Sequence, residues 1–357
     1  MLRLVRINSW WNTIVPQVLG WVYFSILTKI FFAAEHRGAH GVSLYAKADI
    51  ARYILFFIAL VSIAAFGYLL NDLCDIEADT KSGKPNHLAG LDVAKRIFIV
   101  SLSLSVGMVA WIKLNFYPDL YLPLKRLANL LFCAQITALV FYSVKPLRLK
   151  ERAEMGVLVD AFYGHLNPVL ITLCVFGFSG ILRTWGALLI TLLVLLCFVK
   201  GIRNILLHQI EDRKKDFEAG LNTAVIKYGP WRVINFINRF LFPAEVIFLV
   251  LLTLIICMHI PPCIICLMAF ILMSYLKFSG WKLGYADRRL VEFKFTYFMN
   301  DYYEAWLPVF LLMFLCVYRH EFVFLLILHL ALFPSFISKM GKDIKAIREN
   351  FKTEEDY

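Results

Sequence analysis

The sequence predicts an all-α membrane protein, a polytopic bundle of transmembrane helices. The prediction rests on the composition, the length of the apolar runs and the placement of the basic residues. The chain of 357 residues is 60% hydrophobic and 15% aromatic. A soluble chain of this length would form about two domains. The apolar runs are instead long enough to cross a bilayer, where only helices and closed barrels satisfy the backbone.

Ten apolar runs are candidate spans. The first follows Arg3 and Arg6, as in a signal peptide, but its apolar stretch of about 20 residues exceeds a typical h-region, so we expect it to be retained. The last is short, and a re-entrant or interfacial segment is the alternative to the tenth span that we favour. The runs are 10–32, 52–71, 97–113, 127–143, 157–178, 185–204, 233–257, 263–279, 295–318 and 321–338.

The basic residues divide the loops between these runs into two groups. With the N-terminus inside, the inner segments hold 27 of the 37 Lys and Arg residues and the outer segments hold 9. This bias predicts that the N-terminus and both acidic motifs described below face the cytoplasm. The net charge of +11 is spread over short loops, so we expect a lipid bilayer and no nucleic acid as partner.

A cluster of carboxylates ends the second apolar run, in residues 71–79. At about 100° per residue, Asp72, Asp75 and Asp79 fall on one face of a helix. Carboxylates are costly near hydrocarbon, so the cluster predicts a functional site; the alternative is a solvated acidic helix end. Three like charges repel one another unless a cation lies between them. Oxygen ligands suit Mg²⁺, which completes its shell with water and substrate phosphate.

A second acidic stretch follows the sixth apolar run. Asp212 and Asp216 are four residues apart and therefore share one helical face, which Asn204 and His208 extend toward the span. Two such clusters at span ends would together hold Mg²⁺ ions around one diphosphate. The metal charge would then favour departure of that diphosphate as a leaving group.

Four segments occur in a characteristic order along residues 6–230. They are Arg6-x-x-x-Trp10 with Pro16 and Gly20; Asn-Asp-x-x-Asp-x-x-x-Asp at 71–79; Tyr-Ser-Val-Lys-Pro-Leu-Arg-Leu-Lys at 142–150; and Asp-x-x-x-Asp at 212–216, continuing to Lys-Tyr-Gly at 227–229. Together they resemble the UbiA superfamily of intramembrane prenyltransferases. The chain departs from many members after the first acidic motif, where Lys84-Pro85-Asn86 replaces an arginine-rich stretch.

The resemblance implies an enzyme that transfers a polyprenyl group, with Mg²⁺ as cofactor, from an allylic prenyl diphosphate to a small or lipidic acceptor. It implies one domain over residues 1–340, with 341–357 as a charged cytoplasmic tail. Nine helices are usual in the family, and this chain has nine to ten candidates. We expect them to surround a central active-site cavity that opens to the cytoplasmic side.

The resemblance and the charge pattern together suggest roles for individual residues. The expected metal ligands are Asp72, Asp75, Asp79, Asp212 and Asp216. The residues expected to take part in catalysis are Asp72, Asp75, Asp212 and Lys145. The residues expected to bind substrate are Arg6, Asn71, Lys81, Lys84, Tyr142, Arg148, Arg203, Asn204, His208, Arg213 and Asp301.

The acceptor stays open at this point. An aromatic ring, as in quinone biosynthesis, is the commonest choice in the family, but a glycerol lipid, haem or a sugar phosphate are alternatives. An intramembrane terpene cyclase would need the same aspartates and no acceptor. A non-catalytic lipid carrier would place its charges at the midplane, whereas here they gather at the ends of spans.

Further polar residues interrupt the apolar runs. Asp160, His165 and Asn167 lie in the fifth run, and Asp301 and Glu304 lie in the ninth. Ionisable groups at such depth usually face a cavity or one another. They either line an acceptor pocket and supply its base, or form hydrogen bonds between helices.

Overall fold

The computed structural model describes residues 6–37, 47–117, 122–177, 186–258, 260–277 and 299–355. Within these ranges the chain is helical, and the β-type pairing consists of one isolated bridge between Ala153 and Thr223. The all-α prediction is therefore confirmed. The chain divides into two compact units that alternate along the sequence, and each is described by itself below.

The first unit holds residues 1–10, 36–177 and 193–248. Helix α9 (Gly186–Glu218) and helix α12 (Phe242–Cys257) each contribute one part to it. Its other elements are α1 (Ile7–Trp10), α3 (Lys47–Ser82), α4 (Val93–Leu114), α5 (Leu122–Ser143), η1 (Leu149–Glu151), α6 (Ala153–Ala161), η2 (Phe162–Leu166), α7 (Asn167–Phe176), α10 (Ala224–Tyr228), α11 (Pro230–Phe236) and η3 (Ile237–Leu241).

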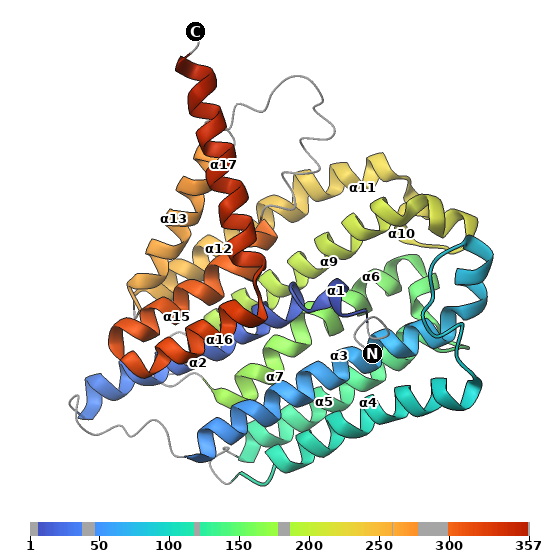
Figure 1. The fold of residues 1–357 in the computed structure, drawn as a ribbon, viewed down its shortest axis with the longest axis horizontal. Coiled ribbons are helices and arrows are strands. Elements are labelled where there is room, and N and C mark those ends of the chain that lie inside the picture. Colours follow the sequence, from blue (N-terminus) through green and yellow to red (C-terminus); the bar gives the residue numbers. More distant parts are fainter. Residues whose placement is uncertain are drawn as a thin grey trace. The chain divides into compact units, whose positions relative to one another are not determined.

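Helix α3 is the centre of this unit, because α4 and α5 both pack along it and α7 packs on α5 (Figure 1). Glycines allow these close approaches. A Cβ on Gly67 would lie 2.7 Å from Cδ2 of Leu139 in α5, and one on Gly107 of α4 would lie 2.9 Å from Cδ1 of Ile63. Small residues at helix contacts are typical of membrane bundles, where close van der Waals packing replaces the hydrophobic drive.

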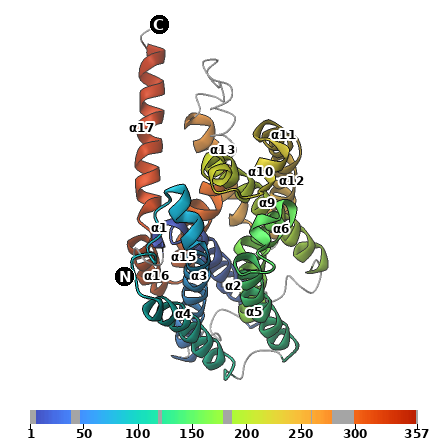
Figure 2. The ribbon, with the colours of Figure 1, turned by 90° about the vertical axis from the view of Figure 1, so that its right-hand side faces the viewer.

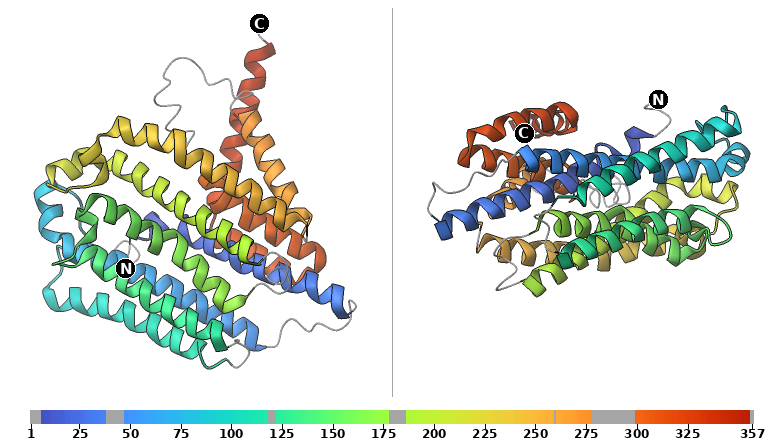
Figure 3. Two further views of the ribbon diagram at one scale, coloured as in Figure 1. Left: turned by 180° about the vertical axis from the view of Figure 1, so that it is seen from behind. Right: turned by 90° about the horizontal axis from the view of Figure 1, so that it is seen from below.

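Helix α9 packs in the same way against α6. A Cβ on Gly201 would lie 2.8 Å from the Cα of Ala161. On another side of α9, Arg203 forms an ion pair with Glu245 of α12, and the two helices run side by side (Figure 3). The π-helical turn η2 continues α6 into α7, and it precedes Pro168, which lacks the amide donor that a regular α-helix would use there.

The second unit holds residues 11–35, 178–192 and 249–357. It includes most of α2 (Ile14–Arg37), α13 (Pro262–Lys277), η5 (Tyr302–Trp306), α15 (Leu307–Tyr318), η6 (His320–Phe322), α16 (Val323–Leu332) and α17 (Ser335–Glu355). Its core contacts include a hydrogen bond of 3.0 Å between Tyr23 Oη and Nδ1 of the buried His329.

Seven of the described helices are long and apolar enough to cross a membrane, so the chain is an integral, multi-pass membrane protein. They cover 51–81, 93–114, 122–143, 153–176, 186–218, 230–257 and 299–318. The predicted runs 10–32 and 263–279 correspond to the shorter apolar helices 14–30 and 262–276. The count of nine to ten spans stays a prediction.

The predicted tenth span, 321–338, is divided in the structure. Helix α16 ends at Leu332, and α17 starts at Ser335 after a bend of 74° between the two helices, as Figure 2 shows. Pro334 explains the break, because it lacks an amide donor and disfavours a helical conformation at Phe333. With its ten residues, α16 is too short to cross a bilayer alone.

Candidate functional site

The first acidic motif lies in the last turns of α3, because the helix continues past the predicted span end to Ser82. Asp72 is buried, and Asp75 and Asp79 are half-buried on the same helical face. The predicted carboxylate stripe therefore exists as a helical surface of the first unit. Each of its three carboxylates has a polar partner from another segment.

Asp72 is held by the N-terminal segment. Its Oδ1 lies 3.2 Å from Nη1 of Arg6, whose guanidinium is 6.0 Å from the ring centroid of Tyr68. Trp10 stacks on the ring of Tyr68, with the two ring centroids 6.1 Å apart. Arg6 thus forms an ion pair with the first carboxylate of the motif, and its predicted role in binding substrate stays a prediction.

Asp75 contacts two positively charged side chains, those of Arg148 and Lys150. Its Oδ1 accepts a hydrogen bond of 2.9 Å from Nη2 of Arg148, and both of its oxygens accept from the Lys150 ammonium. Asn71 donates to Oδ2 at 3.0 Å and accepts from Lys150 at 2.8 Å. Arg148 has a φ of 36°, a left-handed conformation that is costly for a residue with a Cβ, and such strain is found where a site requires it.

Lys150 was missed by the sequence prediction, although the quoted motif ends at it. Lys145, which was predicted instead, is exposed and acts electrostatically on Glu77. Burial lowers the pKa of the Lys150 ammonium, and the negative charge of Asp75 opposes this shift. The position of Lys150 in the sequence could have indicated this contact. Arg148 and Lys150 follow the turn at 144–147, and this turn brings both side chains back over α3.

The segment after α3 links the two acidic motifs. Asn86 donates to the backbone oxygen of Asp72 at 2.7 Å and to Oδ2 of Asp79 at 2.8 Å. Lys84 Nζ lies 3.2 Å from Oδ1 of Asp216 and 3.8 Å from Oδ2 of Asp212. The Lys-Pro-Asn sequence therefore supplies a cation to the second motif and an amide to the first.

The second motif lies in the last turns of α9, where Asp216 is buried and Asp212 is half-exposed. The chain then turns at Gly220, whose φ of 70° suits glycine at a helix C-terminus. Beyond this turn, the carbonyl of Asn222 accepts a hydrogen bond of 3.1 Å from the amide of Ala153. The end of the second motif is thereby fixed beside the start of α6, close to η1 and its Lys150.

The donor set of this site fits a hard divalent cation, because its ligands are carboxylate and amide oxygens. In the described ranges no three carboxylate, histidine or cysteine groups converge on one point. Mg²⁺ does not require three, since it commonly takes one or two carboxylates together with water and phosphate. Lys84 between Asp212 and Asp216 shows that positive charge is stabilised there.

Other predicted residues have different surroundings. Arg203 donates to Glu245 through Nε at 2.5 Å and Nη2 at 3.0 Å, and both side chains are 0% exposed. Such an arginine is part of the core, and its predicted role in binding substrate stays a prediction. Arg213 is exposed, and His208 is exposed with Nδ1 at 3.8 Å from Glu211.

Asn204, Tyr142 and Asp301 complete the predicted set. Asn204 is buried, and its Oδ1 has no hydrogen-bond partner in the described part of the chain. The ring of Tyr142 packs edge-on against that of Tyr163. Asp301 lies in the second unit, where its Oδ1 is 2.6 Å from Nζ of Lys339.

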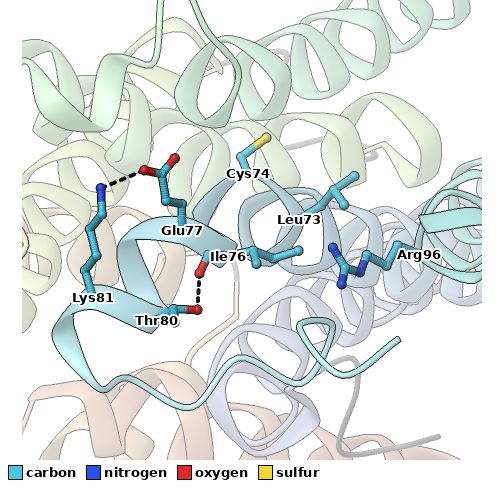
Figure 4. Close-up of a pocket in the computed structure, with 7 residues that line it drawn as sticks. All are labelled: Leu73, Cys74, Ile76, Glu77, Thr80, Lys81 and Arg96. Atoms are coloured by element: carbon cyan, nitrogen blue, oxygen red, sulfur yellow. Dashed lines mark hydrogen bonds and ion pairs between the residues drawn. The ribbon is translucent and has the colours of Figure 1, made fainter. Parts of the chain in front are cut away.

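A pocket of about 590 Å³ lies beside the first motif but on another face of α3 (Figure 4). Lys81 lines it and pairs with Glu77 one turn away at 2.6 Å, and both side chains are exposed. Arg96 points toward the pocket from α4. Lys81 therefore faces away from the carboxylate stripe, in contrast to its predicted place near the diphosphate.

The fold and this site define the class of protein: a polytopic helical membrane protein with a polar site, rich in carboxylates and cations, at the ends of its helices. A comparison of the sequence with known families identifies the family. A model of the UbiA prenyltransferase family matches residues 38–302, and the chain belongs to that family. The resemblance seen in the four motifs is thus confirmed.

Similar proteins agree with this assignment. The chain is 31% identical over 183 residues to a digeranylgeranylglyceryl phosphate synthase of Sulfurisphaera tokodaii, and the match spans 50% of this chain and 58% of that relative. A structure of a UbiA homologue from Archaeoglobus fulgidus bound to DMAPP and Mg²⁺ superimposes with a TM-score of 0.55 at 17% identity. It covers 85% of this chain and 96% of the other. The same homologue bound to GPP and Mg²⁺ gives a TM-score of 0.52 at 16% identity, covering 85% and 97%.

Proposed function

We propose that this protein catalyses Mg²⁺-dependent transfer of a prenyl group from an allylic prenyl diphosphate to an acceptor within the membrane. The observation that carries the proposal is the joining of the two acidic motifs, whose five carboxylates lie among Arg6, Lys84, Arg148 and Lys150. Family membership and the solved homologues with DMAPP or GPP and Mg²⁺ support the donor class.

The residues of the site have complementary tasks in this proposal. Asp72, Asp75, Asp79, Asp212 and Asp216 would hold Mg²⁺, which supplies charge neutralisation for the diphosphate when it is bound. The side chains of Arg148, Lys150 and Lys84 would donate charge-assisted hydrogen bonds to its oxygens. The bond between the allylic carbon and oxygen then breaks, and the diphosphate departs with the electron pair.

Two acceptor classes enter the proposal. The motif resemblance favours an aromatic ring, as is commonest in the family. The partly matching relative acts, by its name, on a glyceryl phosphate, which favours a lipidic glycerol phosphate. We place the site on the cytoplasmic side because the basic residues bias the loops that way.

The experiment is pyrophosphate release by the purified protein in nanodiscs. Allylic diphosphates of several lengths are tested with Mg²⁺ or chelator, first without acceptor and then with an aromatic acid or a glycerol phosphate lipid. Mg²⁺-dependent release stimulated by one acceptor, with the prenylated acceptor as product, is expected. A cyclic hydrocarbon formed without acceptor would instead identify a cyclase, and Mg²⁺-independent lipid binding without release would identify a carrier.

A further inference from the structure

A second polar group of the first unit lies outside the acidic site. Asp160, at the end of α6, accepts a hydrogen bond of 2.6 Å at Oδ2 from the hydroxyl of Tyr163 in η2. Tyr142 of α5 is the next side chain that interacts with Asp160, and its ring centroid is 5.2 Å from that of Tyr163 at an interplanar angle of 71°. All three side chains are half-buried.

Residues that interact with this group also lie near the acidic motifs along three helices. Tyr68, whose electrostatic neighbours include Asp160, precedes Asp72 by four residues on α3. Tyr142 adjoins Ser143, whose hydroxyl donates to Asn71 at 3.4 Å. On α9, His208 acts on Asp160 and precedes Asp212 by four residues.

The charge surroundings of Asp160 differ from those of the metal-site carboxylates. Asp72, Asp75 and Asp216 each pair with an arginine or a lysine. Asp160 has no such ion pair in the described ranges; its neighbours are the hydroxyls of Tyr163 and Tyr142 and the imidazole of His208. A carboxylate that is not bound to a cation keeps lone pairs available for a proton.

The backbone around Asp160 is held firmly. Gln135 of α5 donates at 2.9 Å to the carbonyl of Tyr163, inside the π-helical turn. Asn167 donates to Gln135 Oε1 at 2.7 Å and to the carbonyl of Leu131 at 2.9 Å. Single π-helical turns within helices occur frequently at functional sites, and these hydrogen bonds hold the backbone of the turn that carries Tyr163.

We propose that Asp160 is the base that accepts the acceptor's proton, with Tyr163 as the residue that positions its carboxylate. The inference rests on the proposed function and specifies the proton path at that site. As the allylic carbon–oxygen bond breaks, the acceptor's electron pair forms the new bond to the allylic carbon. The proton of the acceptor, from its hydroxyl or from the attacked ring carbon, moves to Oδ of Asp160, and the diphosphate keeps the electrons of the broken bond.

The test separates bond cleavage from proton removal. Prenyl transfer to the acceptor and Mg²⁺-dependent donor cleavage without acceptor are measured for the wild type, Asp160→Asn, Tyr163→Phe and Asp72→Asn. The matched control is Asp92→Asn, because Asp92 is an exposed cap at the start of α4 and asparagine caps equally well. Size-exclusion profiles and thermal stability in detergent establish that each variant is folded.

The expected result for Asp160→Asn is transfer reduced by about 10²-fold or more, the usual contribution of a general base, with donor cleavage within about twofold of wild type. Tyr163→Phe is expected to lose about tenfold in transfer by the same reasoning. Asp72→Asn is expected to lose both reactions, and Asp92→Asn neither. The fall in transfer rate at low pH is expected to disappear in Asp160→Asn but to persist in His208→Gln. The His208→Gln variant thereby tests whether the imidazole of His208, instead of the Asp160 carboxylate, causes that fall.

Two outcomes would overturn the assignment: wild-type transfer in Asp160→Asn, or equal loss of transfer and cleavage. If Asp160→Asn does not fold, Tyr163→Phe decides, because wild-type transfer in it removes the positioning role and the proposal with it. Failure of the proposed function is distinguishable, since the wild type itself would then release no pyrophosphate with any donor and acceptor.

Discussion

Two arginine–carboxylate pairs in the first unit look alike in composition but differ in surroundings. Arg203 and Glu245 form an ion pair in which both side chains are fully buried, between α9 and α12. Arg148 and Asp75 share their charges with Lys150, Glu151 and Asn71 at the ends of helices. A fully buried pair belongs to the packed core, whereas a shared cluster of charges at helix ends has capacity for a further ion. The type of residue therefore does not reveal the role; the burial of the group does.

The largest effect on turnover is expected when one carboxylate of the shared cluster is neutralised. Asp75→Asn removes an expected metal ligand, and metal charge contributes several kcal/mol to such reactions. We expect turnover to fall on the order of 10³-fold, with a smaller loss of thermal stability than in the Arg203–Glu245 pair, because Arg148 keeps Glu151 as a partner. The measurement is pyrophosphate release beside a melting curve. Wild-type turnover in Asp75→Asn would refute the proposed site.

The corresponding change in the buried pair of Arg203 and Glu245 is expected to lower stability and leave turnover unchanged. Glu245→Gln leaves the Arg203 guanidinium buried without its counter-charge, which typically costs about 3–5 kcal/mol. We expect a large drop in thermal stability, with normal turnover per folded molecule. The double replacement Arg203→Met with Glu245→Leu serves as control and should recover stability. If the Glu245→Gln protein is stable but binds the donor poorly, Arg203 would instead have a role in substrate binding.

A smaller effect separates the two lysines of the segment 142–150. Lys150 contacts Asp75 and Asn71, whereas Lys145 is exposed. Because a charge-assisted hydrogen bond contributes roughly 1.5–3 kcal/mol, Lys150→Met is expected to lower kcat/KM for the donor by about 10- to 100-fold. Lys145→Met is the matched control and should differ from wild type by about twofold at most, given its exposure. The reverse order would restore the role predicted for Lys145 from the motif.

The smallest expected effect concerns Lys84, which lies between Asp212 and Asp216. Its ammonium competes with Mg²⁺ for these carboxylates but also attracts the diphosphate. Lys84→Gln should therefore lower the Mg²⁺ concentration at half-maximal rate, by about two- to fivefold, and raise KM for the donor by a similar factor. Titrations of Mg²⁺ and donor measure the two separately. The exposed Lys81→Gln is the control, and equal shifts in both variants would indicate a general loss of surface charge.

Local sequence was sufficient for the carboxylate stripe but not for its partners. Helical periodicity alone brings Asp72, Asp75 and Asp79 to one face, because residues three and four apart share a face. The partners Lys150, Asn86 and Arg6 come from segments up to 75 residues away, and their approach depends on turns and helix packing. Proximity in sequence to a motif did not bring Lys81 or Arg203 onto the face of that motif.

The sequence by itself indicated the all-helical membrane fold and the shared helical faces of the five carboxylates, and its four motifs carried the resemblance to the family. The fold and the faces follow from composition, hydrophobic period and local spacing, which are properties of neighbouring residues. Only the tertiary structure decided that Arg203 belongs to the core, that Lys150 and not Lys145 reaches Asp75, and that the last apolar run breaks at Pro334 into α16 and α17. These outcomes depend on which helices pack together, because burial and ion pairing are decided by contacts between segments distant in sequence.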